Sequence, residues 1–264
     1  MEQRAHAPVA AIITRRMFST ITILWLRQLK RYARSPARII GSIGQPVLFL
    51  VALGFGFGPI FQKAGAGNYI EFLAPGVVAM GILFTALFSG IEIIWDRQFG
   101  FLKETLVAPV SRLSIMAGRT LGGATVAMGQ GVIVLVISFF AGFRFSPAHL
   151  PLTLLFMFLI AVLFTALGTA IASPLSDMQG FQLIMNFVVM PTFFLSGALF
   201  PLNGLPRPIA LIASADPLSY GVDGLRAALT QASHFGVGTD LAVLSVSCAM
   251  LLAAGAWLFS RIQV

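Results

Sequence analysis

Long apolar runs separated by short polar stretches dominate this chain from residue 39 onward. A helix needs about 20 predominantly apolar residues to cross the hydrocarbon core of a bilayer, and six windows reach that length. The windows are residues 39–58, 72–94, 113–140, 150–171, 181–201 and 241–260. The pattern predicts an all-α membrane protein with six transmembrane helices. Because six is even, both termini are expected on the same side of the membrane.

Before the first window, residues 17–34 follow a helical rather than a continuous apolar pattern. Apolar residues recur at steps of three or four, with basic residues between them, which predicts an amphipathic helix. We expect this helix to lie at the inner membrane interface, where Trp25 and Tyr32 reach the headgroups. A helix packed inside a soluble subdomain is the alternative. The candidate interfacial residues are Trp25, Arg27, Lys30 and Arg31, and Pro36 is expected to end the helix.

Charge fixes the predicted orientation. Only 10% of the 264 residues are charged, whereas soluble domains carry about 25%. With six spans and a cytoplasmic N-terminus, thirteen of the 17 Lys and Arg residues face the cytoplasm, as the positive-inside rule requires. The sequence pI of about 10.8 is then explained by topology, and nucleic acid is not expected as a partner. Arg15 and Arg16 interrupt the apolar core that a cleavable signal would need.

These patterns divide the chain into two parts. Residues 1–38 form a cytoplasmic N-terminus with the amphipathic helix, and residues 39–264 form the six-span domain. We expect a multi-pass protein of a bacterial inner membrane, in contact with lipid and with both termini in the cytoplasm.

The small residues and the amide residues inside the spans can each be interpreted in two ways. The pairs Gly54–Gly58 and Gly118–Gly122 predict close helix packing, within the chain or between two copies. Gln130 and Asn186 either line a substrate path or bond to a neighbouring helix.

Charged residues are not expected at the centre of any span. Glu92 is expected near the inner boundary, where it reaches water or Arg97, and it is a weak candidate for a proton site. The missing central charge disfavours an ion-coupled secondary carrier, which stays open as one alternative.

Two connecting segments are unusual. The inner loop 95–112, WDRQFGFLKETLVAPVSR, predicts a short amphipathic helix that docks onto a soluble partner or lies on the lipid. The outer stretch 195–226, LSGALFPLNGLPRPIALIASADPLSYGVDGLR, is rich in proline yet apolar. It predicts re-entrant helices over about 202–226, broken at residues 206–208 and at Asp216–Pro217, with an ordinary surface loop as the alternative.

With the segment SDMQGFQ before the fifth window, these two blocks resemble the permease subunits of ABC transporters of the type-2 exporter family. The resemblance covers nearly the whole chain after the amphipathic helix. It implies a half-transporter that works as a pair with a cytosolic dimer of ATP-binding-cassette subunits, which bind ATP and Mg. The implied coupling residues are Arg97, Phe101, Leu102, Lys103 and Glu104. No lysine follows a phosphate-binding glycine pattern, so the chain itself is expected not to be an enzyme and to hold no cofactor or metal.

The resemblance also suggests the path and the cargo. A path between two copies would be lined by the first, second and fifth spans. Candidate path residues are Phe49, Phe84, Phe88, Gln130, Asn186, Phe193 and Phe194. Such a surface favours a hydrophobic, drug-like or lipidic cargo, although phenylalanine also fills ordinary helix contacts. Export of a lipid-linked polysaccharide or lipo-oligosaccharide is the alternative.

Overall fold

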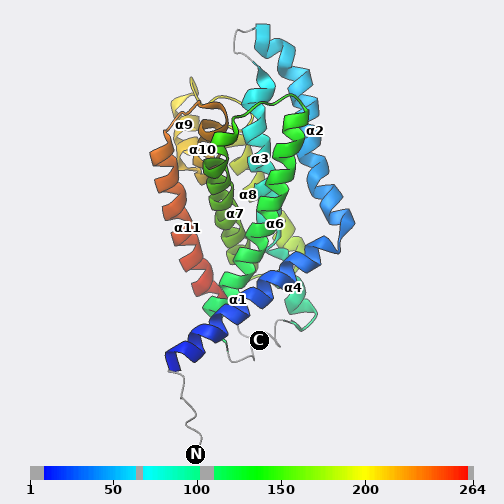
Figure 1. The fold of residues 1–264 in the computed structure, drawn as a ribbon, viewed down its shortest axis with the longest axis vertical. Helices are drawn as coiled ribbons and strands as arrows, with labels where there is room; N and C mark the ends of the chain where they lie inside the picture. Colours follow the sequence, from blue (N-terminus) through cyan, green and yellow to red (C-terminus); the bar gives the residue numbers. More distant parts are fainter. Residues whose placement is uncertain (1–8, 64–67, 102–109, 261–264) are drawn as a thin grey trace, which may run out of the picture.

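The computed structural model describes residues 9–63, 68–101 and 110–260 as a bundle of helices, with no strand in these ranges (Figure 1). Six helical segments in these ranges are long and apolar enough to cross a membrane. They are Pro36–Lys63, Tyr69–Gln98, Arg112–Phe140, Pro147–Ala172, Met178–Leu195 and Val237–Leu258. Each overlaps one predicted window, so the all-α, six-span fold class is confirmed.

The elements follow one another along the chain with short connections. They are α1 (Val9–Ala33), α2 (Pro36–Lys63), α3 (Tyr69–Phe88), α4 (Ile91–Gln98), α6 (Arg112–Phe140), the 3-10 helix η1 (Pro147–His149), α7 (Leu150–Ala172), α8 (Met178–Leu195), α9 (Arg207–Ala215), α10 (Pro217–Thr230) and α11 (Val237–Ser260).

The fifth predicted window extended to residue 201, and this end was wrong. α8 stops at Leu195 because Gly197 adopts a φ of 73°, which a helix cannot continue.

α3 forms the core of the bundle. In the span Tyr69–Gln98, which α3 begins, 83% of the apolar window is buried, whereas only 17% of the α2 window and 22% of the α8 window are buried. α3 gives way to α4 at Gly90, which packs directly on the backbone of α7. A Cβ atom on Gly90 would lie 2.3 Å from the carbonyl oxygen of Gly168, so only glycine fits at this bend. The second span is therefore two helices held tightly against α7.

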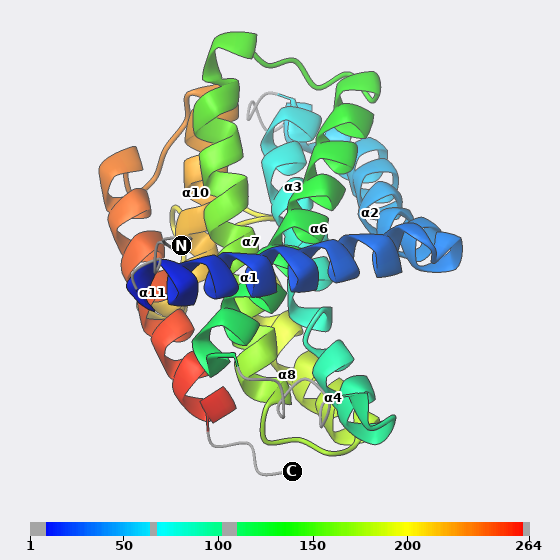
Figure 2. The same ribbon diagram turned by 60° about the horizontal axis from the view of Figure 1, so that its bottom comes forward.

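The predicted amphipathic helix is present as α1, and it ends before Pro36 as expected. It crosses one end of the bundle instead of running along the other helices (Figure 2). Gly118 and Gly122 of α6 let α1 approach closely, since a Cβ atom on Gly122 would lie 2.5 Å from the side chain of Gln28. This glycine pair therefore serves packing within the chain. In the other pair, a Cβ atom on Gly54 would lie 3.2 Å from the side chain of Ile70, and a Cβ atom on Gly58 would have no such neighbour within 4 Å.

The proline-rich stretch forms α9 and α10 at the end of the bundle opposite α1 (Figure 1). The predicted breaks are confirmed, because α9 begins at Arg207 after Pro206 and Asp216 caps α10. The cap is a hydrogen bond of 2.9 Å from the backbone N–H of Leu218 to the Asp216 carboxylate. α10 is buried against α3, α7 and α11. The depth of these helices in a membrane stays a prediction.

Candidate functional site

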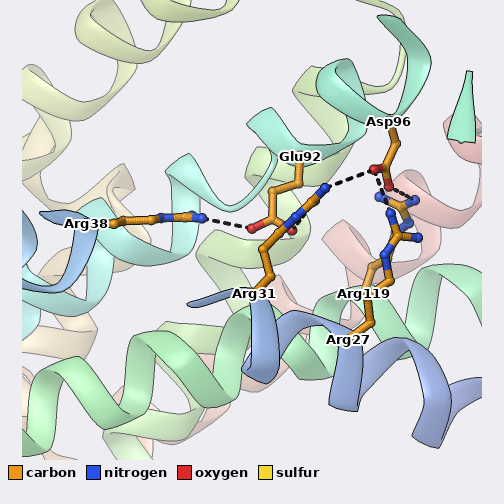
Figure 3. Close-up of polar contacts among 6 residues, drawn as sticks. All are labelled: Arg27, Arg31, Arg38, Glu92, Asp96 and Arg119. Atoms are coloured by element: carbon orange, nitrogen blue, oxygen red, sulfur yellow. Dashed lines mark hydrogen bonds and ion pairs between the residues drawn. The ribbon is translucent and has the colours of Figure 1, made fainter. Parts of the chain in front are cut away.

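Six charged side chains meet where α1 crosses the bundle, and we call them the inner cluster (Figure 3). The members are Arg27, Arg31, Arg38, Glu92, Asp96 and Arg119. The two carboxylates lie one turn apart on α4, so they point from the same face of that helix. The arginines come from α1, α2 and α6. Four helices are therefore joined at one point.

Asp96 is the centre of the inner cluster. Its carboxylate lies 2.6 Å from the Arg119 guanidinium, 2.8 Å from that of Arg27 and 3.5 Å from that of Arg31. The Asp96 side chain is only 2% exposed and that of Arg119 only 7%. Charge-assisted bonds of this length are about twice as strong as neutral ones.

Glu92 extends the inner cluster to the next helix. Its carboxylate accepts hydrogen bonds from Arg38 at 2.9 Å and from Arg31 at 3.3 Å. Arg31 therefore bridges the two acids, as Figure 3 shows. The expectation that Glu92 reaches water or Arg97 was wrong, because Glu92 is buried and α1 and α2 supply its partners. With four guanidinium groups and two carboxylates, the inner cluster keeps an excess of two positive charges.

The predicted interfacial residues have different surroundings. The indole N–H of Trp25 donates to Thr125 on α6 at 3.0 Å, while Lys30 is exposed. Arg27 and Arg31 belong to the inner cluster. α1 is thus fixed to the bundle along one side by polar bonds as well as by packing.

The predicted coupling residues are only partly described. The guanidinium of Arg97 donates to the carbonyl oxygens of Leu175 and Ser173, both at 2.6 Å, and ties α4 to the end of α7. Phe101 is exposed. Leu102, Lys103 and Glu104 lie outside the described residues, so their role stays a prediction.

The predicted path phenylalanines fall into two groups of ring contacts around α8. Phe49 meets Phe193 with ring centroids 6.0 Å apart, and Phe193 meets Phe194 at 5.6 Å. Phe84 stacks on Phe88, which contacts Phe181 of α8 at 6.3 Å.

The two predicted amides are not brought together. Asn186 is exposed on α8. The carbonyl of Gln130 is buried and accepts hydrogen bonds from Tyr32 at 3.2 Å and Ser42 at 3.1 Å. These bonds favour the structural reading of Gln130 as a link between α6 and the α1–α2 corner.

Sequence reasoning did not find the inner cluster. By sequence, Arg38 and Arg119 are two of the thirteen basic residues expected to face the cytoplasm, and Asp96 is one residue of the inner loop. One signal was available, because Arg119 follows apolar residues in the third span, where an unpaired arginine would be costly. That position favours a nearby acid as its partner.

The opposite end of the molecule has a cavity of about 280 Å³ beside α10, with a mainly apolar surface and a few polar groups. Its lining includes Asp223, Arg226 and Ser219 together with the rings of Phe61 and Phe72. The Arg226 guanidinium lies 4.2 Å from the centroid of the Phe72 ring and donates to the carbonyl of Gly197 at 2.8 Å. Burial lowers the pKa of Arg226 to about 10, against the opposing effect of the Asp223 charge.

Comparison with known proteins places this arrangement in a family. The model of the ABC-2 type transporter family matches residues 19–230. A putative transport permease, ycf38, of Pyropia yezoensis is 33% identical over 227 residues, covering 83% of this chain and 76% of that protein. Nodulation protein J of Sinorhizobium fredii is 25% identical and covers 91% of this chain and 92% of its own.

A third relative carries a more specific name. The probable doxorubicin resistance ABC transporter permease DrrC of Mycobacterium tuberculosis is 27% identical over 219 residues, covering 80% of this chain and 77% of that protein. Subunits of this class are transport components of the membrane and not ATPases. The chain belongs to the ABC-2 type transporter family, and it is the transmembrane permease subunit of an ABC transporter.

Proposed function

We propose that two copies of this permease and two cytosolic ATP-binding-cassette subunits form an exporter for hydrophobic, drug-like or lipidic molecules. ATP and Mg are bound by the partner subunits. The inner cluster faces the cytoplasm and the α9–α10 end faces outward. The relative named for doxorubicin resistance and the exposed phenylalanines of α2 and α8 support this class of cargo.

The inner cluster is the observation that carries the proposal. α4 leads directly into the inner loop, and its two carboxylates hold it to α1, α2 and α6. Separating a buried carboxylate from its guanidinium leaves an uncompensated charge, so these contacts resist small displacements. A push on the inner loop would therefore move α4 together with α1 and α6 as one body. Coupling of this kind needs about 5.5 kcal/mol of differential nucleotide binding to move a 1:99 equilibrium to 99:1.

Pairing of two copies is supported by the faces of α2 and α8. Both helices expose large apolar side chains, among them Phe55 (64%) and Phe187 (82%). Exposed phenylalanine side chains can also contact lipid. The proposal of pairing is therefore based on membership of the family together with these two exposed faces. The path would then run where α2 and α8 of each copy meet.

Reconstitution tests this function. The chain and its ATP-binding-cassette subunit are placed together in proteoliposomes, and a panel of hydrophobic and amphiphilic compounds is screened for stimulated ATP hydrolysis and for ATP-dependent movement. The control is the same complex with the phosphate-binding lysine of the partner replaced. Movement that continues with this inactive partner would contradict the proposal and would support an ion-coupled carrier.

A second candidate cargo is a lipid-linked polysaccharide or lipo-oligosaccharide. The specific observation in its favour is the 280 Å³ cavity at the α9–α10 end, where a few hydrogen-bonding groups stand beside two phenylalanine rings on a mainly apolar surface. Such a lining suits an amphiphile that has both apolar and polar parts. Including glycolipids in the compound panel decides between the two cargo classes, because only one class should stimulate ATP hydrolysis.

A further inference from the structure

α1 has a groove on a different side from its packing contact with α6. Leu24 and Gln28 are buried on the packed side, where glycines of α6 approach them. The groove has a volume of about 620 Å³ and a mainly apolar surface. We call it the α1 groove. The described residues that line it recur at helical steps of three and four, and they are Ile23, Leu26, Arg27, Lys30, Arg31 and Arg34.

The α1 groove is strongly basic. Arg27 and Arg31 belong to the inner cluster, yet 36% and 33% of their side chains remain exposed. Lys30 and Arg34 are exposed, and neither forms an ion pair with any residue that the structure describes. The helix Val9–Ala33 contains no acidic residue. Together, the α1 groove and the inner cluster contain six basic side chains and only two carboxylates, so positive charge is in excess at this end of the bundle.

Apolar side chains stand beside these charges. The side chains of Ile23 and Leu26 are 62% and 39% exposed, although both are fully apolar. The methylene stems of lysine and arginine can also lie on hydrocarbon while their charged ends reach polar groups. A small inorganic anion would match only the charges of the groove. A ligand that matches all of it needs a negative group joined to an apolar part.

The α1 groove lies next to the point where the chain enters the membrane. The first span begins at Pro36, two residues after Arg34. Lipid headgroups lie just outside the hydrocarbon that a span crosses. A cluster of four or more basic residues on an amphipathic helix beside a span is typical of anionic-lipid binding. The position of the groove therefore favours a lipid over a soluble anion.

We propose that the α1 groove binds an anionic phospholipid of the phosphatidylglycerol type. The charged ends of Lys30 and Arg34 contact its headgroup, and the exposed parts of the two inner-cluster arginines supply further N–H donors. The acyl chains contact Ile23 and Leu26. The bound lipid offsets the excess positive charge beside the inner cluster and holds α1 at the membrane. This requires only that the permease is in a membrane, and it is independent of the cargo, the direction of transport and the partner subunits.

Photocross-linking tests the site directly. The full chain is placed in phosphatidylcholine vesicles that contain a trace of phosphatidylglycerol with a photoreactive diazirine in its acyl chain, close to the ester. After illumination, peptide mass spectrometry should find this lipid attached within residues 23–34. Excess unlabelled phosphatidylglycerol should suppress the cross-link, whereas inorganic phosphate should not.

The control for lipid that merely surrounds the protein is phosphatidylcholine with the same diazirine. Its cross-link within residues 23–34 should be much weaker, and added salt should reduce the difference between the two lipids by screening the charges. Equal yields from the two lipids in low salt would overturn the proposal. This comparison uses the wild-type chain, so it decides the question even if a variant does not fold.

Two double variants with the same loss of charge locate the headgroup contact. Lys30→Gln with Arg34→Gln should reduce the phosphatidylglycerol cross-link by about tenfold, because basic side chains near an anionic headgroup each contribute to binding. Lys63→Gln with Arg207→Gln removes two exposed basic residues outside the α1 groove and should leave the yield unchanged. Equal yields from the two double variants would contradict the proposed contacts.

An acidic surface of the ATP-binding-cassette subunit is the competing occupant of the α1 groove. Co-purification of that subunit with the same double variants distinguishes it from lipid. If Lys30→Gln with Arg34→Gln abolishes co-purification while the wild-type chain shows no preference for phosphatidylglycerol, the groove binds the protein partner and the lipid proposal is wrong. Normal co-purification together with the loss of the lipid cross-link would support the lipid site.

Discussion

Arg119 of α6 and Asp96 of α4 form an ion pair of 2.6 Å in which both side chains are almost completely buried. The pair joins the start of the third span to the helix that leads into the inner loop. Asp96 also binds Arg27 of α1, so one carboxylate fixes three helices. The inner cluster therefore holds these helices together through buried ion pairs, and its charges are not separate, solvated groups on the surface.

Asp96→Asn should destabilise the fold strongly. The substitution keeps the shape of the side chain but leaves the buried Arg119 guanidinium without its counter-charge, which typically costs 3–5 kcal/mol. The measurement is the free energy of unfolding of the purified chain by denaturant titration. Glu71→Gln is the control, because Glu71 is an exposed acid at the other end of the bundle. Equal effects of the two variants would show that the Asp96 pairs contribute little.

Gly122→Ala should loosen α1. The added Cβ atom would lie 2.5 Å from the side chain of Gln28, so the two helices must move apart, at a cost of about 1–3 kcal/mol. Gly129→Ala is the matched control on the same helix, since no atom beyond the adjacent turns of the helix itself lies within 4 Å of its Cβ position. Thermal unfolding checks the difference, and Trp25 fluorescence reports on its contact with Thr125. A loss of stability in the control that matches Gly122→Ala would rule out the packing explanation.

Two phenylalanines of α8 should respond in opposite ways. Phe193 is 1% exposed, so Phe193→Ala should leave a cavity and cost about 3–5 kcal/mol of unfolding free energy. Phe187 is 82% exposed, so Phe187→Ala should change the stability of the single chain by less than about 0.5 kcal/mol. The proposed pairing predicts that Phe187→Ala instead weakens cross-linking between copies in proteoliposomes. Undiminished cross-linking would remove this face of α8 from the proposed interface.

Stability should fall as the pH rises through neutrality, in part because of Asp216. Burial raises its pKa from 3.8 to about 7, so the folded chain binds this proton more tightly than the unfolded chain does. Its stabilising contribution is present below about pH 4 and is lost as the pH rises through 7. Asp216→Asn keeps an N-cap residue on α10 and should reduce the fall in thermal midpoint between pH 4 and pH 8. An unchanged pH profile in this variant would show that Asp216 does not titrate in this range.

The spans and breaks could be predicted from sequence because they depend on local pattern. The lengths of the apolar runs predicted six membrane helices. Pro36, Pro206 and Pro217 lie at helix boundaries in the structure. The end of the fifth span was missed because the positive φ of Gly197 interrupts an apolar sequence that reads as continuous.

The contacts between helices could not be predicted in the same way. Glu92 pairs with Arg38, which is 54 positions away in the sequence, so only the crossing of α1 and α2 over the bundle brings the two together. The buried state of Asp240 was hidden as well, because the residue follows a polar loop in the sequence and is covered only by the packing of α10 and α11. Local sequence patterns are sufficient to predict the helices, but the charge pairs depend on how the helices cross in the folded protein.

The proposed exporter requires that the inner cluster face the cytoplasm and that the α9–α10 end face outward. Accessibility of single cysteines to a membrane-impermeant maleimide in intact cells measures this directly, in a Cys248→Ser background that removes the one native cysteine. Lys30→Cys on α1 and Arg207→Cys on α9 are suitable, since both positions are exposed. We expect labelling at position 207 in intact cells and at position 30 only after the cells are opened. Labelling at position 30 in intact cells would contradict this orientation and the proposed exporter.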